Sequence, residues 1–246
     1  MLQTNQIYCG DSIELCKQID DNSIDLIFAD PPFNLKRSYG IDKDNRINYV
    51  EWCQNWIDIG VDKLKPGGTF IIHHIPKYAI ILGNYMMKKL EFQNLVSWKT
   101  ANMPIINRLL PENFSFLIFS KGNLKTFNRF GDSVEHKKCR HCNKILADWG
   151  GKKKHMKETK RVSDVWLDIE RIRHNKNKHR AHNELPIKIM DRIIKIYTNK
   201  GDLVLDLFIG SGTTAESAER LNRNFIGIEI SEEYCNITRE RLNYVA

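Results

Sequence analysis

The stretch that decides the fold runs from a short apolar segment into a glycine-rich turn: Leu203-Val204-Leu205-Asp206-Leu207-Phe208-Ile209-Gly210-Ser211-Gly212-Thr213-Thr214. Its first five residues predict a buried strand, and the spacing after it predicts a helix over residues 213–221. Glycines at such a turn let a ligand approach the backbone closely, and the start of the helix offers free N–H groups. In an open parallel sheet, ligands bind in this crevice.

An acidic residue ends the next predicted strand, residues 225–229. Glu229 follows Asp206 by about 23 residues, a spacing at which a carboxylate accepts hydrogen bonds from both hydroxyls of a ribose. Ala215 stands where the dinucleotide-binding fingerprint has its third glycine, and the looser form of that fingerprint allows it. This motif alone is therefore compatible with a nicotinamide-dependent oxidoreductase and with other enzymes whose cofactor contains a nucleoside.

Strands alternate with helices along most of the chain. The expected strands are residues 24–29, 69–73, 92–98, 114–119, 203–207 and 225–229, and the expected helices are residues 12–19, 49–64, 78–90, 186–198, 213–221 and 231–244. The two strands between 92 and 119 could form an antiparallel pair, and residues 65–68 are expected to break the chain between a helix and a strand. This alternation predicts an α/β protein with a Rossmann-like, mostly parallel sheet and helices on both faces.

Net charge is concentrated in one segment. The chain has 246 residues, of which 41% are hydrophobic and 28% charged, and this composition excludes an intrinsically disordered chain. Residues 121–182 carry 18 Lys and Arg against 7 Asp and Glu, so their net charge is +11 while the whole chain has +8. A polyanion partner explains this localisation, and a solvated surface is the alternative. Periodicity also fades here, so we expect an inserted segment at 121–182 between the two parts of one domain, residues 1–120 and 183–246.

The chain shows no signal for a membrane or for secretion. It contains no run of about 18 apolar residues that would span a bilayer. The first residues lack the basic and apolar pattern of a secretory signal, so we expect a cytoplasmic protein whose six cysteines are reduced thiols or metal ligands.

A second turn also follows a predicted strand: Asp30-Pro31-Pro32-Phe33. Two prolines fix the backbone and remove two N–H donors, so the carbonyls of this turn are expected to be free acceptors. A rigid, acceptor-only turn beside a carboxylate suits a substrate that donates two hydrogens, such as an exocyclic amino group. Phe33 offers a flat face for stacking on an aromatic base.

Together, the two turns give the chain a resemblance to the amino-methyltransferases of DNA, which transfer a methyl group from S-adenosylmethionine to adenine N6 or cytosine N4. Asp30 to Phe33 resemble the catalytic motif of this family, and Asp206 to Thr214 resemble its cofactor motif. The catalytic motif comes first, as in the permuted β group, in which the DNA-recognition segment lies between the two motifs. The basic segment 121–182 occupies that place.

The resemblance implies roles for individual residues. Asp30, Pro31, Pro32 and Phe33 would form the catalytic turn, with Asp30 and the Pro31 carbonyl accepting the amino hydrogens of a flipped-out base. Asp11, in Tyr8-Cys9-Gly10-Asp11, would lie at the adenine of the cofactor. His182 matches a His that the family has in the segment before the helix that covers the cofactor. The implied cofactor-binding residues are Asp11, Asp30, His182, Asp206, Phe208, Gly210, Ser211, Gly212, Thr213, Thr214 and Glu229.

The basic segment contains a Cys-x-x-Cys pair, Cys139 and Cys142. Such a pair with a distal His can hold structural zinc, and His155 is the next candidate ligand after the two cysteines. Two ordinary surface thiols are the alternative. His73 and His74 end a strand at the predicted ligand edge, where we expect them to pack near the cofactor rather than act as metal ligands or catalysts.

Several functional alternatives stay open. An Asp at the first motif position favours adenine as the target, which gives an adenine-N6 methyltransferase of double-stranded DNA, and a cytosine-N4 methyltransferase is the main competitor. A protein or RNA amine methyltransferase usually carries Asn before the prolines. A non-catalytic zinc-dependent DNA-binding module would explain the basic segment alone. The resemblance also implies a bacterial or phage origin, and it leaves open a homodimer and a cognate restriction endonuclease.

Overall fold

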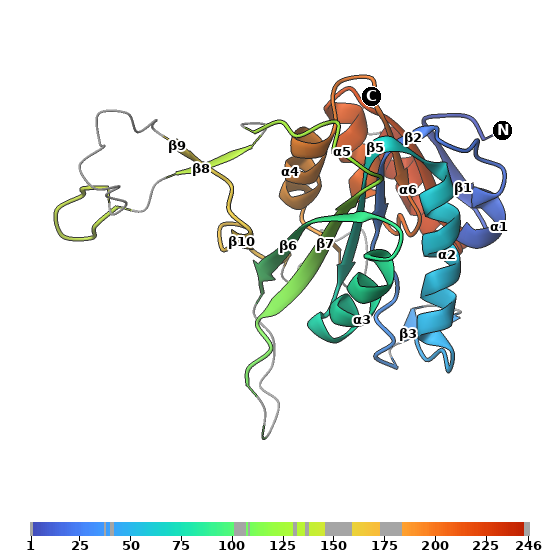
Figure 1. Ribbon diagram of the computed structural model, residues 1–246, viewed down its shortest axis with the longest axis horizontal. Coiled ribbons are helices and arrows are strands. Elements are labelled where there is room, and N and C mark those ends of the chain that lie inside the picture. The colour runs from blue at the N-terminus through green and yellow to red at the C-terminus, as the bar shows by residue number, and fades with distance from the viewer. Residues whose placement is uncertain are drawn as a thin grey trace.

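The protein is built on one large twisted sheet, seen in the computed structural model (Figure 1). The structure describes residues 2–36, 38–39, 42–100, 107, 109–129, 132–135, 138–145, 159–172 and 184–243. In spatial order the strands are β1 (Gln6–Cys9), β12 (Asn224–Glu229), β11 (Leu203–Asp206), β2 (Ile24–Ala29), β5 (Leu64–His74), β7 (Asn113–Ser120), β6 (Glu91–Lys99) and β10 (Val165–Trp166). Of these strands, β7 alone runs antiparallel to both of its neighbours, so the predicted mostly parallel α/β sheet is confirmed.

Helices cover both faces of this sheet (Figure 1). They are α1 (Ser12–Cys16), α2 (Tyr49–Lys63), α3 (Pro76–Met86), α4 (Ile187–Tyr197), α5 (Thr213–Arg220) and α6 (Glu232–Asn243). Residues of α1, α2 and α3 share one buried cluster with one face of the strands, and residues of α4, α5 and α6 share a second cluster with the other face. No helix in the described ranges is both long and apolar enough to cross a membrane.

Strand β2 shows why apolar and polar residues do not alternate in the central strands. Leu26 and Phe28 belong to the cluster under α4–α6, whereas Ile27 and Ala29 belong to the cluster under α1–α3. Successive side chains of a strand point to opposite faces, so a strand covered on both faces is apolar throughout.

Two of the differences from the predicted boundaries involve proline. The sequence predicts a break at residues 65–68, but β5 already begins at Leu64 and continues to His74. Its pairing with β2 is irregular there, because Gly67 has a φ of 79° and the ladder with β2 resumes only at Thr69. Pro186 is expected in the first turn of a helix, but it is the N-cap of α4, with an extended ψ of 134°, since proline fixes φ and leaves ψ free.

Both ends of the segment 121–182 are attached to the main body. At its start, the Lys121 ammonium donates hydrogen bonds to the carbonyls of Val61 and Leu64. Near its end, β10 extends the sheet beside β6, and Trp166 and Ile169 are buried in the core. Between these ends lie two short strands, β8 (Ser133–Glu135) and β9 (Thr159–Arg161), which pair antiparallel and project away from the body (Figure 1). A further short pair, β3 (Ser38–Tyr39) and β4 (Asp42–Lys43), follows the Asp30 turn.

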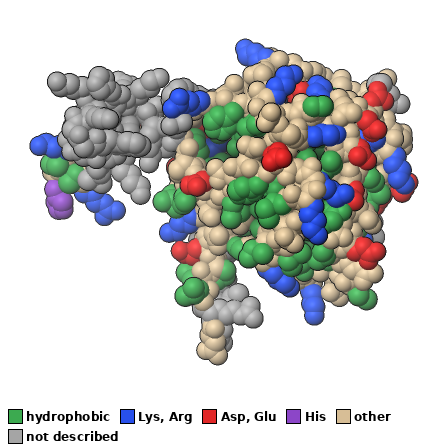
Figure 2. Space-filling model, viewed as in Figure 1, with side chains coloured by type: hydrophobic (Ala, Val, Ile, Leu, Met, Phe, Trp, Pro, Cys, Tyr) green, Lys and Arg blue, Asp and Glu red, His purple; other side chains and the backbone are tan. Residues whose placement is uncertain are grey.

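We define the arm as the described residues 132–145 and 159–161. Lys138, Arg140 and Lys144 on the arm are exposed. In Figure 2 the projecting part carries Lys and Arg side chains, whereas on the visible face of the body they are interspersed with Asp and Glu.

A buried arginine ties the arm to the body. The guanidinium of Arg192 on α4 donates to Asp132 at 2.5 Å and to both carboxylate oxygens of Asp168 at 3.1 and 2.5 Å. It also lies 5.1 Å from the ring centroid of Trp166. Only 5% of its side chain is exposed. One cation on the helix thus anchors two points of the basic segment.

We expect Arg192→Leu to lower the free energy of unfolding by about 2 kcal/mol, because hydrogen bonds between charged partners contribute about 1.5–3 kcal/mol. Urea denaturation followed by circular dichroism measures this change. Arg220→Leu is the matched control, since Arg220 pairs with Asp191 while 46% of its side chain is exposed, and exposed pairs contribute less than about 1 kcal/mol. Equal losses in the two variants would contradict the anchoring role of Arg192.

Candidate functional site

The ends of neighbouring parallel strands bring the predicted residues to one edge of the sheet. Asp206 pairs with Phe28 of β2, so Asp30 lies just beyond it on the next strand. Ala29 pairs with Ile72, which sets Asp30 beside His73 at the end of β5. The carboxyl ends of β1, β12, β11, β2 and β5 accordingly carry, in order, Asp11, Glu229, Asp206, Asp30 and the pair His73 and His74.

The glycine turn between β11 and α5 needs its glycines for two different reasons. Gly210 and Gly212 have φ values of 54° and 88°, in the left-handed region that favours glycine. A Cβ atom on Gly212 would also lie 2.5 Å from the Cγ2 atom of Thr238, so helix α6 closes on the turn. The Thr238 hydroxyl donates to the Gly210 carbonyl at 2.8 Å, which fixes the turn from the α6 side.

Two carboxylates hold this turn in shape. Asp206 is buried and accepts hydrogen bonds from the Phe208 backbone N–H at 2.9 Å and from the Thr214 hydroxyl at 2.5 Å. Burial raises the pKa of Asp206 to about 7, and the nearby Asp30 and Glu229 carboxylates add to the rise. Glu229 accepts from the backbone N–H groups of Gly210 and Ser231, both at 2.9 Å. Both acids thus brace the turn, and their contacts with a cofactor remain predictions.

The remaining predicted cofactor residues surround the turn. Ser211, Thr213 and Thr214 are buried at the start of α5. Phe208 packs against Trp52 and Trp56 of α2, with ring centroids 5.6 and 5.4 Å away. Asp11 caps α1, because its Oδ1 atom accepts from the backbone N–H of Ile13 at 2.8 Å. His182 lies outside the described residues, and its role stays a prediction.

At the Asp30 turn, one of the expected free carbonyls is already occupied. The Tyr49 hydroxyl donates to the Pro32 carbonyl at 2.5 Å, a contact the sequence did not predict because Tyr49 comes from the start of α2. Among the described residues, no donor contacts the Pro31 carbonyl or the Oδ2 atom of Asp30. The Oδ1 atom of Asp30 lies 2.8 Å from Nδ1 of His73. The turn therefore presents one carbonyl and one carboxylate oxygen as free acceptors.

His74 supports the turn through Tyr49. The backbone N–H of Ile75 donates to Nδ1 of His74 at 2.8 Å, and burial lowers the pKa of this imidazole to about 3. His74 is therefore neutral with its hydrogen on Nε2, which lies 2.7 Å from the Tyr49 hydroxyl oxygen. A hydrogen-bond chain thus runs from His74 through Tyr49 to the Pro32 carbonyl. The expectation that the two histidines only pack near a cofactor missed these contacts.

Phe33 is less accessible than its predicted role implies. Its ring stacks on His74 with centroids 4.8 Å apart, and 6% of the residue is exposed. Phe114 lies 5.5 Å away by the same measure. A base would therefore contact Phe33 only after one of these neighbours shifts, and stacking on a base remains a prediction.

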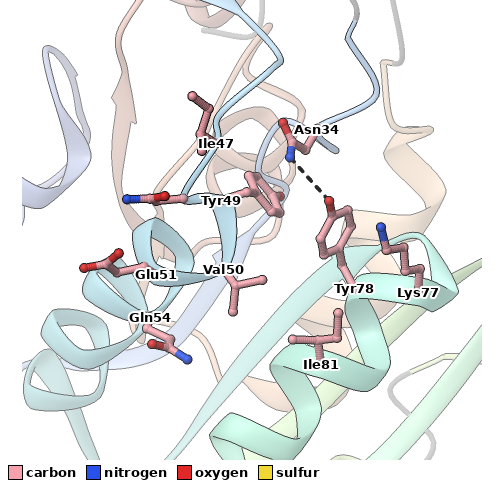
Figure 3. A pocket seen from close by; sticks show the side chains of 10 residues that line it. Asn34, Ile47, Tyr49, Val50, Glu51, Gln54, Lys77, Tyr78 and Ile81 are labelled. Carbon is pink, nitrogen blue, oxygen red and sulfur yellow. Dashed lines mark hydrogen bonds between the residues drawn. The ribbon is translucent and has the colours of Figure 1, made fainter.

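An open pocket lies beside the turn but does not contain Asp30. Its volume is about 480 Å³, and it lies between the starts of α2 and α3. Tyr49 and Tyr78 face it, and the Asn34 amide donates to the Tyr78 hydroxyl at 3.3 Å (Figure 3). Asn34, with φ of 56°, also receives the Arg46 backbone N–H on its Oδ1 atom at 2.8 Å. The pocket therefore lies on the outer side of the Asp30 turn.

The Cys-x-x-Cys pair lies in a tight hairpin of the arm. Lys138 bridges to Ile145, the Cys139 N–H donates to the Lys144 carbonyl at 2.7 Å, and Asn143 has φ of 55°. Backbone N–H groups of Cys142 and His141 point at the Cys139 sulfur and lower the pKa of its thiol. This environment favours a thiolate. No cluster of three or more metal-binding side chains occurs in the described ranges, which omit His155, so zinc remains a prediction.

The chain matches a known family over most of its length. The family model for N6/N4 DNA methylases matches residues 24–240. The chain therefore belongs to this family, as the motifs of the sequence indicate.

Relatives of the chain are bacterial type II methyltransferases. M.BamHI of Bacillus amyloliquefaciens is 45% identical over 246 residues, which cover 96% of this chain and 56% of M.BamHI. The chain thus spans little more than half the length of that relative. M1.MboII of Moraxella bovis is 30% identical over 256 residues, which cover 99% of this chain and 98% of M1.MboII.

Solved structures share the fold. The cytosine-N4-specific PvuII DNA methyltransferase aligns with a TM-score of 0.72 at 22% identity, covering 97% of this chain and 90% of that one. The complex of M1.HpyAVI with S-adenosylmethionine aligns with a TM-score of 0.65 at 23% identity, covering 97% and 98%. At these identities the likeness establishes the architecture alone.

We expect the purified protein to contain about one zinc ion per chain, measured by inductively coupled plasma mass spectrometry after purification without chelators. Cys139→Ser with Cys142→Ser should remove the zinc, because both predicted ligands are lost. Cys9→Ser is the control, since Cys9 is an exposed thiol outside the hairpin. Metal-free wild-type protein would contradict a zinc site.

Proposed function

We propose that the chain transfers a methyl group from S-adenosylmethionine to the exocyclic N6 of an adenine flipped out of double-stranded DNA. The observation that carries this proposal is the pair of free acceptors on the Asp30 turn, Asp30 Oδ2 and the Pro31 carbonyl. This pair stands next to a glycine turn at the same sheet edge. Membership of the DNA methylase family supports the same reaction.

The residues at the glycine turn fit the proposed cofactor. Ser211 and Thr213 are buried, and their backbone N–H groups have no acceptor in the described part of the chain. Buried N–H groups of this kind need an acceptor, which a bound ligand supplies. Asp11 and Glu229 would hold the adenosine part, and Phe208 would pack on it. S-adenosylmethionine supplies an electrophilic methyl group there, and M1.HpyAVI has been solved with the same compound.

The chain itself contributes orientation and electrostatics. Asp30 Oδ2 and the Pro31 carbonyl accept the two N–H hydrogens of the target amine, which raises electron density on its nitrogen. That nitrogen forms a bond to the methyl carbon as the carbon–sulfur bond breaks, and the sulfur keeps the electron pair. The extra proton on the product nitrogen then leaves, so Asp30 need not be a strong base. Most of the rate gain comes from alignment and fixed dipoles.

Two bases compete as the target. Asp at the first position of the catalytic motif favours adenine, by resemblance to the family. Cytosine N4 is the second candidate, because the N6/N4 family to which the chain belongs includes both targets. Both bases present an exocyclic amino group to the same pair of acceptors, so the acceptor geometry suits either.

We propose double-stranded DNA as the partner of the arm, because its exposed cations project from a body of slightly negative net charge. Base flipping is part of this proposal, since the target amine is otherwise stacked and paired. A homodimer, a cognate restriction endonuclease and action in the bacterial cytoplasm follow from the resemblance and remain predictions.

Incubation with S-adenosylmethionine and unmethylated plasmid DNA, followed by mass spectrometry of the nucleosides, is expected to yield N6-methyladenine. Sequencing that detects modified bases would give the context. N4-methylcytosine instead would contradict adenine and support the second candidate, and the absence of both products would contradict the proposed function.

In the same assay, Asp30→Ala should lower the rate at least about 100-fold, as expected when a preorganised group that stabilises the transition state is removed. Calorimetry should show that the variant still binds S-adenosylmethionine, although more weakly than the wild type, because the glycine turn is intact while one carboxylate at the cofactor edge is lost. A variant that methylates DNA at nearly the wild-type rate would contradict the role of Asp30.

Replacing Lys138, Arg140 and Lys144 with Gln should weaken DNA binding and flatten its salt dependence by about 0.9 in log–log slope per lost phosphate contact. Fluorescence anisotropy at several salt concentrations measures both changes. Lys17, Lys88 and Lys200, which are exposed on the body, form the control triple with the same loss of charge. Equal effects of the two triples would indicate attraction by net charge rather than binding at the arm.

A further inference from the structure

We propose that His73 is a positioning residue that selects which oxygen of Asp30 faces the target amine. It does so by donating its Nδ1 hydrogen to Oδ1, so that Oδ2 is left to the substrate. This inference rests on the proposed role of Asp30 as an acceptor, and the experiments below separate the two.

The register of the sheet creates this contact. Ala29 and Ile72 are paired on adjacent parallel strands, so the residues that follow them, Asp30 and His73, are neighbours. Nδ1 of His73 and Oδ1 of Asp30 are 2.8 Å apart. The carboxylate is 17% exposed and the imidazole 4%, so the pair spans the boundary between the site and the core.

Aromatic rings hold the imidazole in place. Phe116 stacks on it with centroids 4.6 Å apart and planes inclined by 23°. Phe33 and Phe114 make T-shaped contacts with it, with ring centroids 5.4 and 5.3 Å from that of the imidazole. Enclosed in this way, the ring has little freedom to rotate away from Asp30.

The surroundings also determine where the imidazole hydrogen lies. Nε2 of His73 is buried without a hydrogen-bond partner among the described residues. A hydrogen on Nε2 would be an unsatisfied buried donor, and the Nδ1 lone pair would then oppose the Asp30 carboxylate, which is unfavourable. A hydrogen on Nδ1 satisfies the one partner that the ring has among the described residues, the Oδ1 atom of Asp30.

In this arrangement the two carboxylate oxygens of Asp30 have different surroundings. Oδ1 is occupied by the histidine, whereas Oδ2 has no donor from the described chain. A carboxylate that rotated freely would present either oxygen at varying angles to the amine. Because an error of about 1 Å in the position of a reacting group can reduce a rate about 100-fold, a fixed carboxylate matters for alignment.

The tautomer can be measured directly on the protein without cofactor or DNA. In protein labelled with 15N-histidine, long-range 1H–15N spectra distinguish Nδ1–H from Nε2–H imidazoles, and loss of one of the eight signals in His73→Asn assigns His73. We expect the Nδ1–H form. The Nε2–H form would overturn the inference, whatever the activity.

Variants test the function of the contact. His73→Phe keeps an aromatic ring and removes the donor, whereas His73→Asn places an amide nitrogen near the position of Nδ1. We expect His73→Phe to lower kcat at least about 10-fold, His73→Asn to restore most of it, and KM for S-adenosylmethionine to stay within about twofold in both, because the cofactor turn is not touched.

Phe116→Leu is the packing control, since Phe116 is the stacking partner of His73 and holds no donor. Thermal denaturation of all variants measures any loss of stability, so that such a loss is not mistaken for an effect on catalysis. Equal impairment by His73→Phe and His73→Asn, or a matching fall in kcat with Phe116→Leu, would overturn the inference and leave a packing role. An active Asp30→Ala would instead refute the acceptor role of Asp30 on which this inference rests, and the absence of any methylated base with the wild type would refute the proposed function itself.

Discussion

The site depends on the register of three adjacent parallel strands, β11, β2 and β5. Pairing of Asp206 with Phe28 and of Ala29 with Ile72 brings three polar residues to consecutive positions along one edge. Neither turn could supply this arrangement by itself, because each only ends its own strand. A slip by one residue would exchange the side chains that face the two buried clusters, so the close packing of both clusters enforces the register.

The same register concentrates negative charge. Asp30, Asp206 and Glu229 are close enough that the other two carboxylates contribute to raising the pKa of Asp206 to about 7, beyond the effect of its burial. Such an edge favours a ligand with a positive charge, because opposite charges attract strongly where water is excluded. The sulfonium group of the proposed cofactor has this property, whereas the pyrophosphate of a nicotinamide dinucleotide is anionic. Of the cofactors that a glycine turn can bind, the electrostatics of this edge thus favour S-adenosylmethionine over a nicotinamide dinucleotide.

The turns could be predicted from the sequence because their information is local. A strand, two glycines and a helix start are adjacent in the chain, and so are Asp30 and its prolines. The contacts of His73 and Tyr49 were missed, since they depend on which strand lies next to β2 and on where α2 begins. The signal for His73 was present as a pair of histidines at a strand end, and knowledge of the β2–β5 register would have been needed to interpret it.

Composition also described the basic segment only in part. Charge counts treat residues 121–182 as one unit, but buried Trp166 and the anchor of Arg192 connect it to the core. A charge average cannot reveal this, because a few buried apolar residues among many exposed cations scarcely change it. The connection bears on the proposed function, because an arm that binds DNA would have to be held at a defined distance from the Asp30 turn if one base is to reach it.

The turn itself shows how the fold can select a chemical group. Tyr49 occupies the Pro32 carbonyl, His73 occupies one oxygen of Asp30, and Asp44 accepts the backbone N–H groups of Asn34 and Leu35 at 2.5 and 2.9 Å. The Pro31 carbonyl and the Oδ2 atom of Asp30 are left as a pair of acceptors without a donor among the described residues. A base edge with a carbonyl would oppose oxygen to oxygen and leave both unpaired, which costs binding energy. An exocyclic amine would satisfy both acceptors at once, so the proposed preference for an amino group would follow from what the rest of the structure has already occupied.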